Sequence, residues 1–255
     1  MKIAICPNFE KQESLHVEKE FCAILAAKSV SFYRVDDALQ PDTDLLCVIG
    51  GDGTLFAYAP LAIEAGIPIW FINAGSVGFL AESSHDLEAR IDTICAGRYA
   101  TEDYDLLAVS VDGETSLAMN DVCLMRDTKQ LQTITLSVTV GGELVARYRG
   151  DGALVCTARG STGYAMSAGA AIMAPHAKGM MFTPICAHSM LARSVVFGEE
   201  DRIGLQCTEG AVLFVDGVYR QATAQAVDVT VSPRKAVFVV TERQLFFEKV
   251  NRKLL

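Results

Sequence analysis

LLCVIGGDGT, residues 45–54, is the stretch of this chain that decides its fold. Its first five residues are fully apolar, which is typical of a strand buried on both faces of a parallel sheet. A glycine-rich turn follows, and the apolar residues after it predict a helix over residues 55–65 that ends at Gly66. Strand, turn and helix form one unit of a doubly wound α/β sheet, whose ligands bind at the carboxyl ends of the strands.

The turn from Gly50 to Thr54 has the composition of an anion-binding loop. Glycines let a ligand approach the backbone N–H groups, and at the start of a helix these groups attract phosphate. Because a carboxylate repels phosphate, Asp52 indicates chemistry: a base for a hydroxyl, or a ligand for a metal that travels with a phosphate. The turn is neither a Walker A loop nor a Gly-x-Gly-x-x-Gly motif. The alternative is an ordinary corner with Asp52 as helix N-cap.

Residues 1–98 alternate strands with helices. Apolar stripes predict helices over residues 13–28 and 86–96, and short apolar runs predict strands over residues 3–6, 30–35 and 67–73. We therefore expect a doubly wound α/β N-terminal domain over residues 1–98.

From about Tyr99 the pattern changes to short strands. Asp112-Gly113 and Gly141-Gly142 predict hairpin turns, the first between residues 106–111 and 115–125, the second between residues 134–140 and 143–148. Further strands are expected over residues 153–157, 180–185, 202–207, 212–215, 227–231 and 237–241. One helix is expected over residues 164–173, and residues 244–255 form either a last helix or a loose tail. The expected C-terminal domain, residues 99–235, is β-rich.

The composition excludes several classes of protein. With 255 residues, 51% of them hydrophobic, the chain is globular rather than disordered. A net charge of −9 without a basic stripe argues against nucleic acid as a partner. No apolar run approaches the ~18 residues of a membrane span, and the N-terminal apolar stretch is too short for a signal peptide. Eight cysteines without a Cys-x-x-Cys pair predict reduced thiols, no zinc site and a cytoplasmic location.

Three further segments carry polar residues at strand ends or inside strands. Residues 73–80 form a second glycine loop after a strand. Asn120 and Asp121 interrupt an apolar strand, so at least one of them faces a cleft or the interior, where ribose hydroxyls are natural partners. The alternative is a bulge in which both bond the local backbone. In the third segment, residues 156–169, a strand runs into Gly-Ser-Thr-Gly and a helix.

In this third segment Ser161 or Thr162 can cap the helix. The free N–H groups at the start of that helix can meet a ligand. Tyr164 offers a face on which a base can stack.

The ordered set of these motifs resembles the NAD kinase family, which makes NADP from NAD. The resemblance covers roughly residues 45–220 and is carried by GGDGT, INAGSVGFL, MNDV, YRGDG, GSTGYAMSAG, TPICAHS and VDG. It implies that the C-terminal segment, from about residue 236 to 255, returns to the first domain. It also implies a homodimer or homotetramer with the site near a subunit contact, whereas the charge and the apolar runs described above are what argue against a nucleic-acid or membrane partner.

The resemblance also implies roles for single residues. Asp52 is the base that takes the proton from the adenosine 2′-hydroxyl of NAD, in a loop that Gly53 supports. Asn120 and Asp121 hold ribose hydroxyls, and Asp151, with Arg149 beside it, lies near the nicotinamide end. The adenine pocket is expected from Thr162, Gly163, Tyr164 and Ser167. The loop of Gly50, Gly51, Gly53 and Thr54, with Mg²⁺ or another divalent metal, receives the phosphates of the donor, ATP or polyphosphate.

The chain departs from the family pattern at several of these positions. Asp121 stands where the family usually has Glu, Arg159 replaces a residue of the usual Thr-Pro-Thr-Gly-Ser loop, and Val218 replaces a Gln. These changes bear on affinity and donor choice more than on the reaction. Two alternatives remain: a non-catalytic NAD(P)-binding sensor, and a lipid or sugar kinase that shares GGDGT.

Overall fold

The fold is described here from a computed structural model. It describes residues 1–75, 80–127, 129, 132–242 and 245–254, and for residues 209, 221–224 and 252–254 it describes the backbone only. The chain divides into two compact units: Met1–Tyr104 with Lys235–Leu255, and Asp105–Arg234. Strands β5 (Ala100–Val111) and β14 (Val218–Val240) contribute residues to both.

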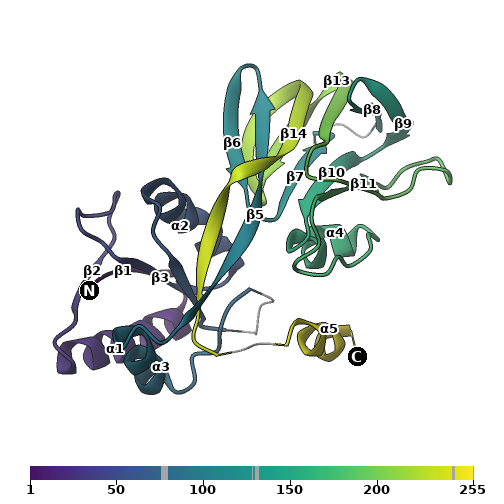
Figure 1. The fold of residues 1–255 in the computed structure, drawn as a ribbon. Helices are drawn as coiled ribbons and strands as arrows, with labels where there is room; N and C mark the ends of the chain where they lie inside the picture. Colours follow the sequence, from purple (N-terminus) through teal and green to yellow (C-terminus); the bar gives the residue numbers. More distant parts are fainter. Residues whose placement is uncertain (76–79, 128, 130–131, 243–244, 255) are drawn as a thin grey trace. The chain divides into compact units, whose positions relative to one another are not determined.

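The first unit is built on a parallel sheet. Its strands are β1 (Lys2–Pro7), β2 (Ser31–Arg34), β3 (Leu45–Gly50) and β4 (Ile69–Asn73), in the order β4-β3-β1-β2, and β14 pairs with β4 where Phe238 meets Ile69. Its helices are α1 (Gln12–Ala27), α2 (Asp52–Ala65), α3 (Leu87–Cys95) and, near the C-terminus, α5 (Phe246–Leu254). The predicted α/β domain is therefore confirmed (Figure 1).

The helices α1 and α3 pack together on one face of this sheet. Phe21 and Leu25 of α1 and Ile91 of α3 share a buried cluster with alternate residues of β1, β3 and β4. The side chains between them point to the opposite face, where α2 places Tyr58 beside Cys6. Both faces are thus covered, as the continuous apolar run of β3 requires.

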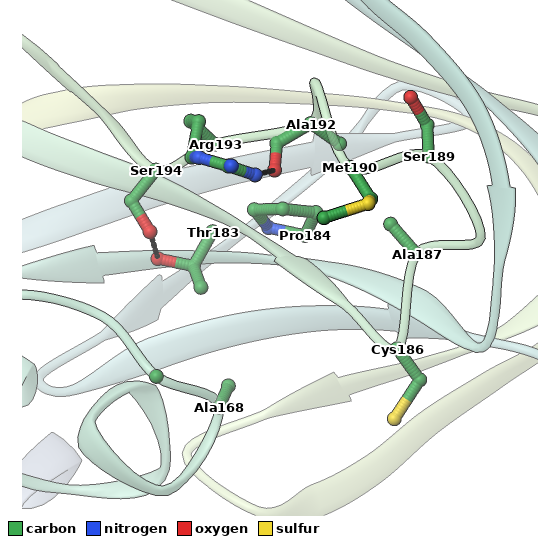
Figure 2. A pocket seen from close by; sticks show the side chains of 11 residues that line it. Ala168, Thr183, Pro184, Cys186, Ala187, Ser189, Met190, Ala192, Arg193 and Ser194 are labelled. Atoms are coloured by element: carbon green, nitrogen blue, oxygen red, sulfur yellow. Dashed lines mark hydrogen bonds between the residues drawn. The ribbon is translucent and has the colours of Figure 1, made fainter.

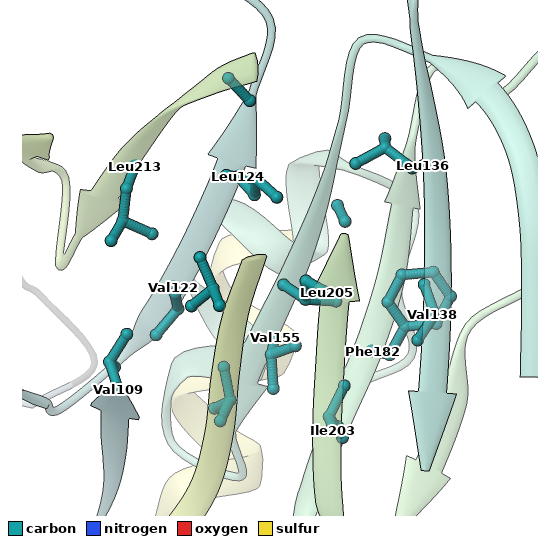
Figure 3. Packing of buried hydrophobic residues seen from close by; sticks show 14 of the residues in the cluster. Val109, Val122, Leu124, Leu136, Val138, Val155, Phe182, Ile203, Leu205 and Leu213 are labelled. Atoms are coloured by element: carbon teal, nitrogen blue, oxygen red, sulfur yellow. The ribbon is translucent and has the colours of Figure 1, made fainter. Parts of the chain in front are cut away.

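The second unit is almost entirely antiparallel β-structure, which confirms the predicted β-rich domain. Its strands besides β5 and β14 are β6 (Glu114–Ala118), β7 (Asp121–Met125), β8 (Ile134–Val140), β9 (Glu143–Gly150), β10 (Gly152–Thr157), β11 (Met180–Ile185), β12 (Val195–Phe197) and β13 (Arg202–Val215). They run in the order β12-β11-β10-β7-β13-β14, with β8-β9 joined to β13 and β6 to β5. Figure 3 shows its core, where Val122, Val155 and Leu205 pack together.

The predicted hairpin turns are confirmed. Asp112 and Gly113 have φ values of 50° and 85°, and Gly141 and Gly142 have φ values of 58° and 86°. Two consecutive residues with positive φ form the turn whose twist matches antiparallel strands.

Two predicted elements are wrong. The strand over residues 115–125 is divided into β6 and β7, because Met119 and Asn120 lie in a bend between them. The helix over residues 164–173 is the four-residue α4 (Tyr164–Ser167), preceded by a 3₁₀ turn over Gly160–Thr162. Gly169, with φ of 83°, ends α4: its N–H donates to Met166 and that of Ala170 to Ala165, a glycine stop of the Schellman type.

Other predicted boundaries also changed. Residues 202–207 and 212–215 belong to one strand, β13, whose register shifts between Gln206 and Phe214, and residues 227–231 and 237–240 both belong to β14. Of the two expectations for the C-terminal residues, the helix is the one found, as α5. Among the described residues, no helix is long and apolar enough to cross a membrane.

Candidate functional site

The loop after β3 is held from its inner side. A Cβ atom on Gly50 would lie 2.6 Å from Oγ1 of Thr54, so packing requires a glycine there. The Nδ2 atom of Asn8 donates to the same Oγ1 atom at 3.0 Å, and the N–H of Thr54 donates to the carbonyl of Gly51 at 3.0 Å. Both the hydroxyl and the N–H of Thr54 are therefore engaged by the protein, and they hold the end of β3 against the start of α2.

The outer side of the same loop is open. Apart from the adjacent residues of the chain and the backbone of α2, no described heavy atom lies within 4 Å of a Cβ atom built on Gly51 or Gly53, and neither residue has a positive φ. Neither packing nor backbone conformation thus requires a glycine at these positions, and the first N–H groups of α2 can be approached. The start of a helix favours anions.

Asp52 lies between these two glycines, in the first turn of α2, with its Oδ1 atom buried. The alternative in which Asp52 is the helix N-cap is wrong. Gly51 is the N-cap, and α2, which lies wholly within the described residues, has no side-chain capping hydrogen bond.

The second glycine loop begins beside the first one. The N–H of Ala74 donates to the carbonyl of Gly50 at 3.3 Å, and the side chain of Asn73 closes a turn on Gly75, accepting its N–H at 3.2 Å and donating to its carbonyl at 2.9 Å. Residues 76–79 of this predicted loop lie outside the described part of the chain.

In the second unit, Asn120 and Asp121 lie at the break between β6 and β7. The carboxylate of Asp216 accepts the N–H groups of Met119 at 2.8 Å, Asn120 at 2.7 Å and Asp121 at 3.1 Å. From the other side, the N–H of Thr157 donates to the carbonyl of Asn120 at 2.9 Å. These contacts fix the backbone from which both predicted ribose-binding side chains project.

Asp121 is buried, with 6% of its surface exposed. Desolvation, followed by the charge of Asp216, raises the pKa of Asp121 to about 7, and the Sγ atom of Cys123 beside it has the opposite, smaller effect. The pKa of Asp216 is also raised by burial, although three backbone N–H groups and Arg220 oppose that shift. Asp121 therefore changes its charge near neutral pH.

The Gly160–Thr162 turn meets the same backbone. A Cβ atom on Gly160 would lie 2.0 Å from the carbonyl oxygen of Asn120, and one on Gly163 would lie 3.3 Å from Nδ2 of Asn120 and 3.9 Å from Oδ2 of Asp121. The structure thus brings together three of the predicted NAD-binding residues, Asn120, Asp121 and Gly163. At position 160, only glycine fits beside the carbonyl oxygen of Asn120.

The expected helix cap in this segment is wrong. The hydroxyl of Ser161 donates to the carbonyl of Ala158 and accepts the N–H of Met173, and the hydroxyl of Thr162 donates to the carbonyl of Arg159. Both hydroxyls thus form hydrogen bonds within the turn and its flanking segments. Within the described residues, no side chain caps α4. Tyr164 is 42% exposed and Ser167 is exposed, so both remain reachable by a ligand.

The carboxylate of Asp151 binds Arg126 and not its sequence neighbour Arg149. The Oδ1 atom of Asp151 accepts from Nε of Arg126 at 2.7 Å, whereas the guanidinium of Arg149 donates to the carbonyl of Thr133 at 3.4 Å. Sequence reasoning missed Arg126 and the role of Asp216. The signal for Arg126 is strand pairing: Gly152 is opposite Met125 in the β10–β7 ladder, which places Asp151 beside Arg126.

A cavity of about 350 Å³ opens beside the end of α4 (Figure 2). Its wall comes mainly from β11 and the segment after it, part of the TPICAHS motif. Within it the Oγ atom of Ser194 donates to Oγ1 of Thr183 at 3.1 Å, and the exposed Arg193 donates to the carbonyl of Ala192. The cavity is lined by Ala168, Gly169, Thr183, Pro184, Cys186, Ala187, Ser189, Met190, Ala192, Arg193 and Ser194.

Both units match known protein families. Residues 9–99 match the ATP-NAD kinase N-terminal domain, and residues 119–241 match the ATP-NAD kinase C-terminal domain. An NAD kinase of Caldicellulosiruptor bescii is 31% identical over 261 residues, which cover 100% of this chain and 99% of that protein. An NAD kinase of Methanothermobacter thermautotrophicus is 31% identical over 278 residues, with 100% and 96% covered.

Two solved structures share the fold. Yeast NADH kinase complexed with NADH has a TM-score of 0.88 at 20% identity, with 100% of this chain and 87% of that chain covered. An NAD kinase from Archaeoglobus fulgidus in complex with ATP has a TM-score of 0.80 at 23% identity, with 100% and 98% covered.

Proposed function

Because this chain belongs to the NAD kinase family, we propose that it phosphorylates the adenosine 2′-hydroxyl of NAD with Asp52 as the general base. The chain is an enzyme that transfers a phosphoryl group to NAD. Family membership selects this activity over the lipid and sugar kinases that share the GGDGT loop. One observation supports the role of Asp52 above the others: the residue lies in the first turn of α2, between two glycines at which a side chain would meet no other part of the described structure.

In this proposal Asp52 accepts the proton of the 2′-hydroxyl as that oxygen bonds to the terminal phosphorus of the donor. The bond from this phosphorus to the bridging oxygen breaks, and the shortened phosphate chain leaves with that oxygen. The N–H groups of Gly51, the N-cap of α2, and of Gly53 in its first turn meet the donor phosphates, and the helix dipole offsets their charge. Because little covalent chemistry falls to the protein in phosphoryl transfer, positioning and charge neutralisation lower most of the barrier.

The residues around Asp52 fit a divalent metal that arrives with the donor. Within the described residues no group of three His, Cys, Asp or Glu side chains could form a cage for an ion. Mg²⁺ is commonly held by one or two carboxylates together with substrate phosphates, and one carboxylate at an open phosphate loop is such a donor set. When bound, Mg²⁺ would neutralise charge on the donor phosphates. Asp52 is the residue we propose to hold it, in addition to its role as base.

We propose that the NAD ribose is held by Asn120 and Asp121. Support comes from their grouping with Gly163, because a side chain at that position would begin 3.3 Å from Nδ2 of Asn120 and 3.9 Å from Oδ2 of Asp121. The exposed ring of Tyr164 provides a stacking surface for adenine, with Thr162 and Ser167 on the same segment.

We also propose a homodimer or homotetramer in which Asp151 serves the nicotinamide end of NAD. The segment after β11 packs on the turn that carries Asp151, because the N–H of His188 donates to the carbonyl of Arg149 at 2.8 Å. That segment carries Met190 and Leu191, which are 83% and 90% exposed. Sedimentation of wild type and Leu191→Asp tests this: a wild-type monomer, or an unchanged assembly in the variant, would contradict the arrangement.

The first experiment is NADP formation from NAD by the purified protein with Mg²⁺, with ATP and polyphosphate compared as donors and NADH as a second acceptor. We expect product with at least one donor, its loss when EDTA removes the metal, and its recovery when Mg²⁺ is restored. Asp52→Asn should abolish turnover while NAD still raises the melting temperature. Asp37→Asn, an exposed residue of the same unit, is the matched control.

Near-wild-type turnover of Asp52→Asn would refute the base assignment. A wild-type protein that binds NAD but forms no product with either donor would favour the non-catalytic sensor. The proposed ribose contact has its own test. Asp121→Ala should mainly raise KM for NAD, and an unchanged KM would contradict that assignment.

A further inference from the structure

Asp216 lies in the turn between β13 and β14, far in sequence from the residues that it contacts. Its φ is 50° and that of Gly217 is 73°, the two positive values of a two-residue hairpin turn. Its Oδ1 atom accepts the N–H groups of Asn120 and Asp121, and its Oδ2 atom accepts that of Met119. In return, the N–H of Asp216 donates to the carbonyl of Asp121 at 2.9 Å.

These hydrogen bonds supply acceptors for backbone N–H groups at the break between β6 and β7. Because β6 ends at Ala118 and β7 begins at Asp121, the N–H groups at the break need a partner, and a buried N–H group without one is costly. One neutral acceptor could satisfy one or two of them. A carboxylate with two oxygens accepts all three and is held by its own turn.

We propose that Asp216 is a positioning residue for NAD: it fixes the backbone of Asn120 and Asp121 so that their side chains face the ribose. The inference rests on the proposed ribose contact of these two residues. Asp216 itself touches no substrate in this scheme. Loss of its geometry should therefore weaken NAD binding more than it slows the chemical step.

Asp216 also acts on Asp121 through its charge. Asp121 is faced by Asp216 from the β13–β14 turn, Cys123 on β7, Cys156 on β10 and Tyr164 on α4. Of these groups, Asp216 is the charged one, and it raises the pKa of Asp121 in addition to desolvation. Removal of its charge should lower that pKa, so Asp121 would stay ionised at a lower pH.

The competing explanation is that Asp216 serves only its turn. Asp112 provides the matched control, because it occupies the same position of the β5–β6 turn, with φ of 50° before Gly113 at 85°. Asn suits this turn position as well as Asp does. Asp216→Asn and Asp112→Asn therefore place the same substitution at the same position of two hairpin turns. Asp216→Asn also replaces an oxygen that accepts the backbone N–H groups of residues 119–121 with an NH₂ group that cannot accept them.

Two variants separate geometry from charge. Asp216→Asn removes the charge and at least one of the three hydrogen bonds, whereas Asp216→Glu keeps the charge and displaces the carboxylate by about one methylene. We expect both to raise KM for NAD about 10-fold, the effect of a lost hydrogen bond to a charged group, with kcat within about 3-fold of wild type. Asp112→Asn should leave both constants unchanged.

The pH profile distinguishes positioning from a merely structural role. For wild type, KM for NAD should rise as the pH falls through about 7, the pKa of Asp121. That rise should move to lower pH in Asp216→Asn and stay in place in Asp216→Glu. If both variants match Asp112→Asn in KM and in pH profile while Asp121→Ala still raises KM, this inference is wrong and the ribose contact stands. If Asp121→Ala has no effect, the ribose contact itself is wrong.

If neither Asp216→Asn nor Asp216→Glu folds, hydrogen exchange of the wild-type protein still tests the inference. Hydrogen exchange should then show the N–H groups of Asn120 and Asp121 as protected as those within β7. Exchange as fast as that of an open loop would overturn the inference.

Discussion

Replacement of Glu82 by Ala should destabilise the first unit strongly. Glu82 has 6% of its surface exposed and its carboxylate joins three elements. It accepts from Nε1 of Trp70 on β4 at 2.8 Å, from Nη1 of Arg90 on α3 at 3.3 Å, and from both the N–H and the hydroxyl of Thr241 after β14, at 2.8 and 2.7 Å. The returning C-terminal segment is thus anchored to the sheet by one buried carboxylate.

The magnitude follows from what the alanine variant leaves behind. Breakage of a buried ion pair by removal of one partner costs about 3–5 kcal/mol, because the remaining charge stays buried. Arg90 keeps a contact with Glu242, which moderates this term, whereas Nε1 of Trp70 loses the carboxylate that it binds. Since these losses do not add, we expect Glu82→Ala to lower the free energy of unfolding by about 3–5 kcal/mol.

The assay is equilibrium unfolding in urea, followed by tryptophan fluorescence. Trp70 is the only tryptophan of the chain, so the signal reports on the unit that contains Glu82. Glu88→Ala is the matched control: its side chain is 71% exposed and pairs with Lys28 at 3.4 Å, a contact whose loss should cost less than about 1 kcal/mol. All variants are compared at one protein concentration.

A loss below about 1 kcal/mol in Glu82→Ala, or a loss equal to that of Glu88→Ala, would refute this reasoning. Such a result would mean that other contacts anchor the C-terminal segment. It would also mean that the free energy of desolvating the Glu82 carboxylate is as large as the stabilisation from its hydrogen bonds.

Three more predictions test single contacts. Gly160→Ala should lower the melting temperature sharply, because its Cβ atom would lie 2.0 Å from the carbonyl oxygen of Asn120; a wild-type melting curve would show that the turn can move. Gly53→Ala should stabilise α2 by up to about 1 kcal/mol in urea unfolding, yet slow NADP formation; full activity would argue against a phosphate at this loop. Asp121 has a pKa raised from 3.8 to about 7, so the folded protein binds this proton more tightly than the unfolded chain. Relative to Asp121→Asn, wild type should lose stability as the pH rises from about 4 to about 7 and change little beyond, and urea unfolding at several pH values that showed no such trend would contradict it.

The sequence by itself determined the elements that obey local rules. The strand, glycine turn and helix over residues 45–65 follow from apolar patterning and from the backbone freedom of glycine, and so do the turns at Asp112-Gly113 and Gly141-Gly142. The motif set also identified the family. The length of α4 also follows from a local signal, because Gly169 ends this helix after four residues.

The tertiary structure alone decided which distant residues meet. Asp216 accepts a hydrogen bond from Asn120, 96 residues away, and Glu82 accepts one from Thr241, 159 residues away. No pattern in the sequence predicts either pair. The break between β6 and β7 belongs to this class, because three N–H groups leave the ladder only where a carboxylate from another hairpin accepts them. Backbone propensity acts over a few residues, whereas a buried polar group is satisfied by whatever the order of strands brings beside it.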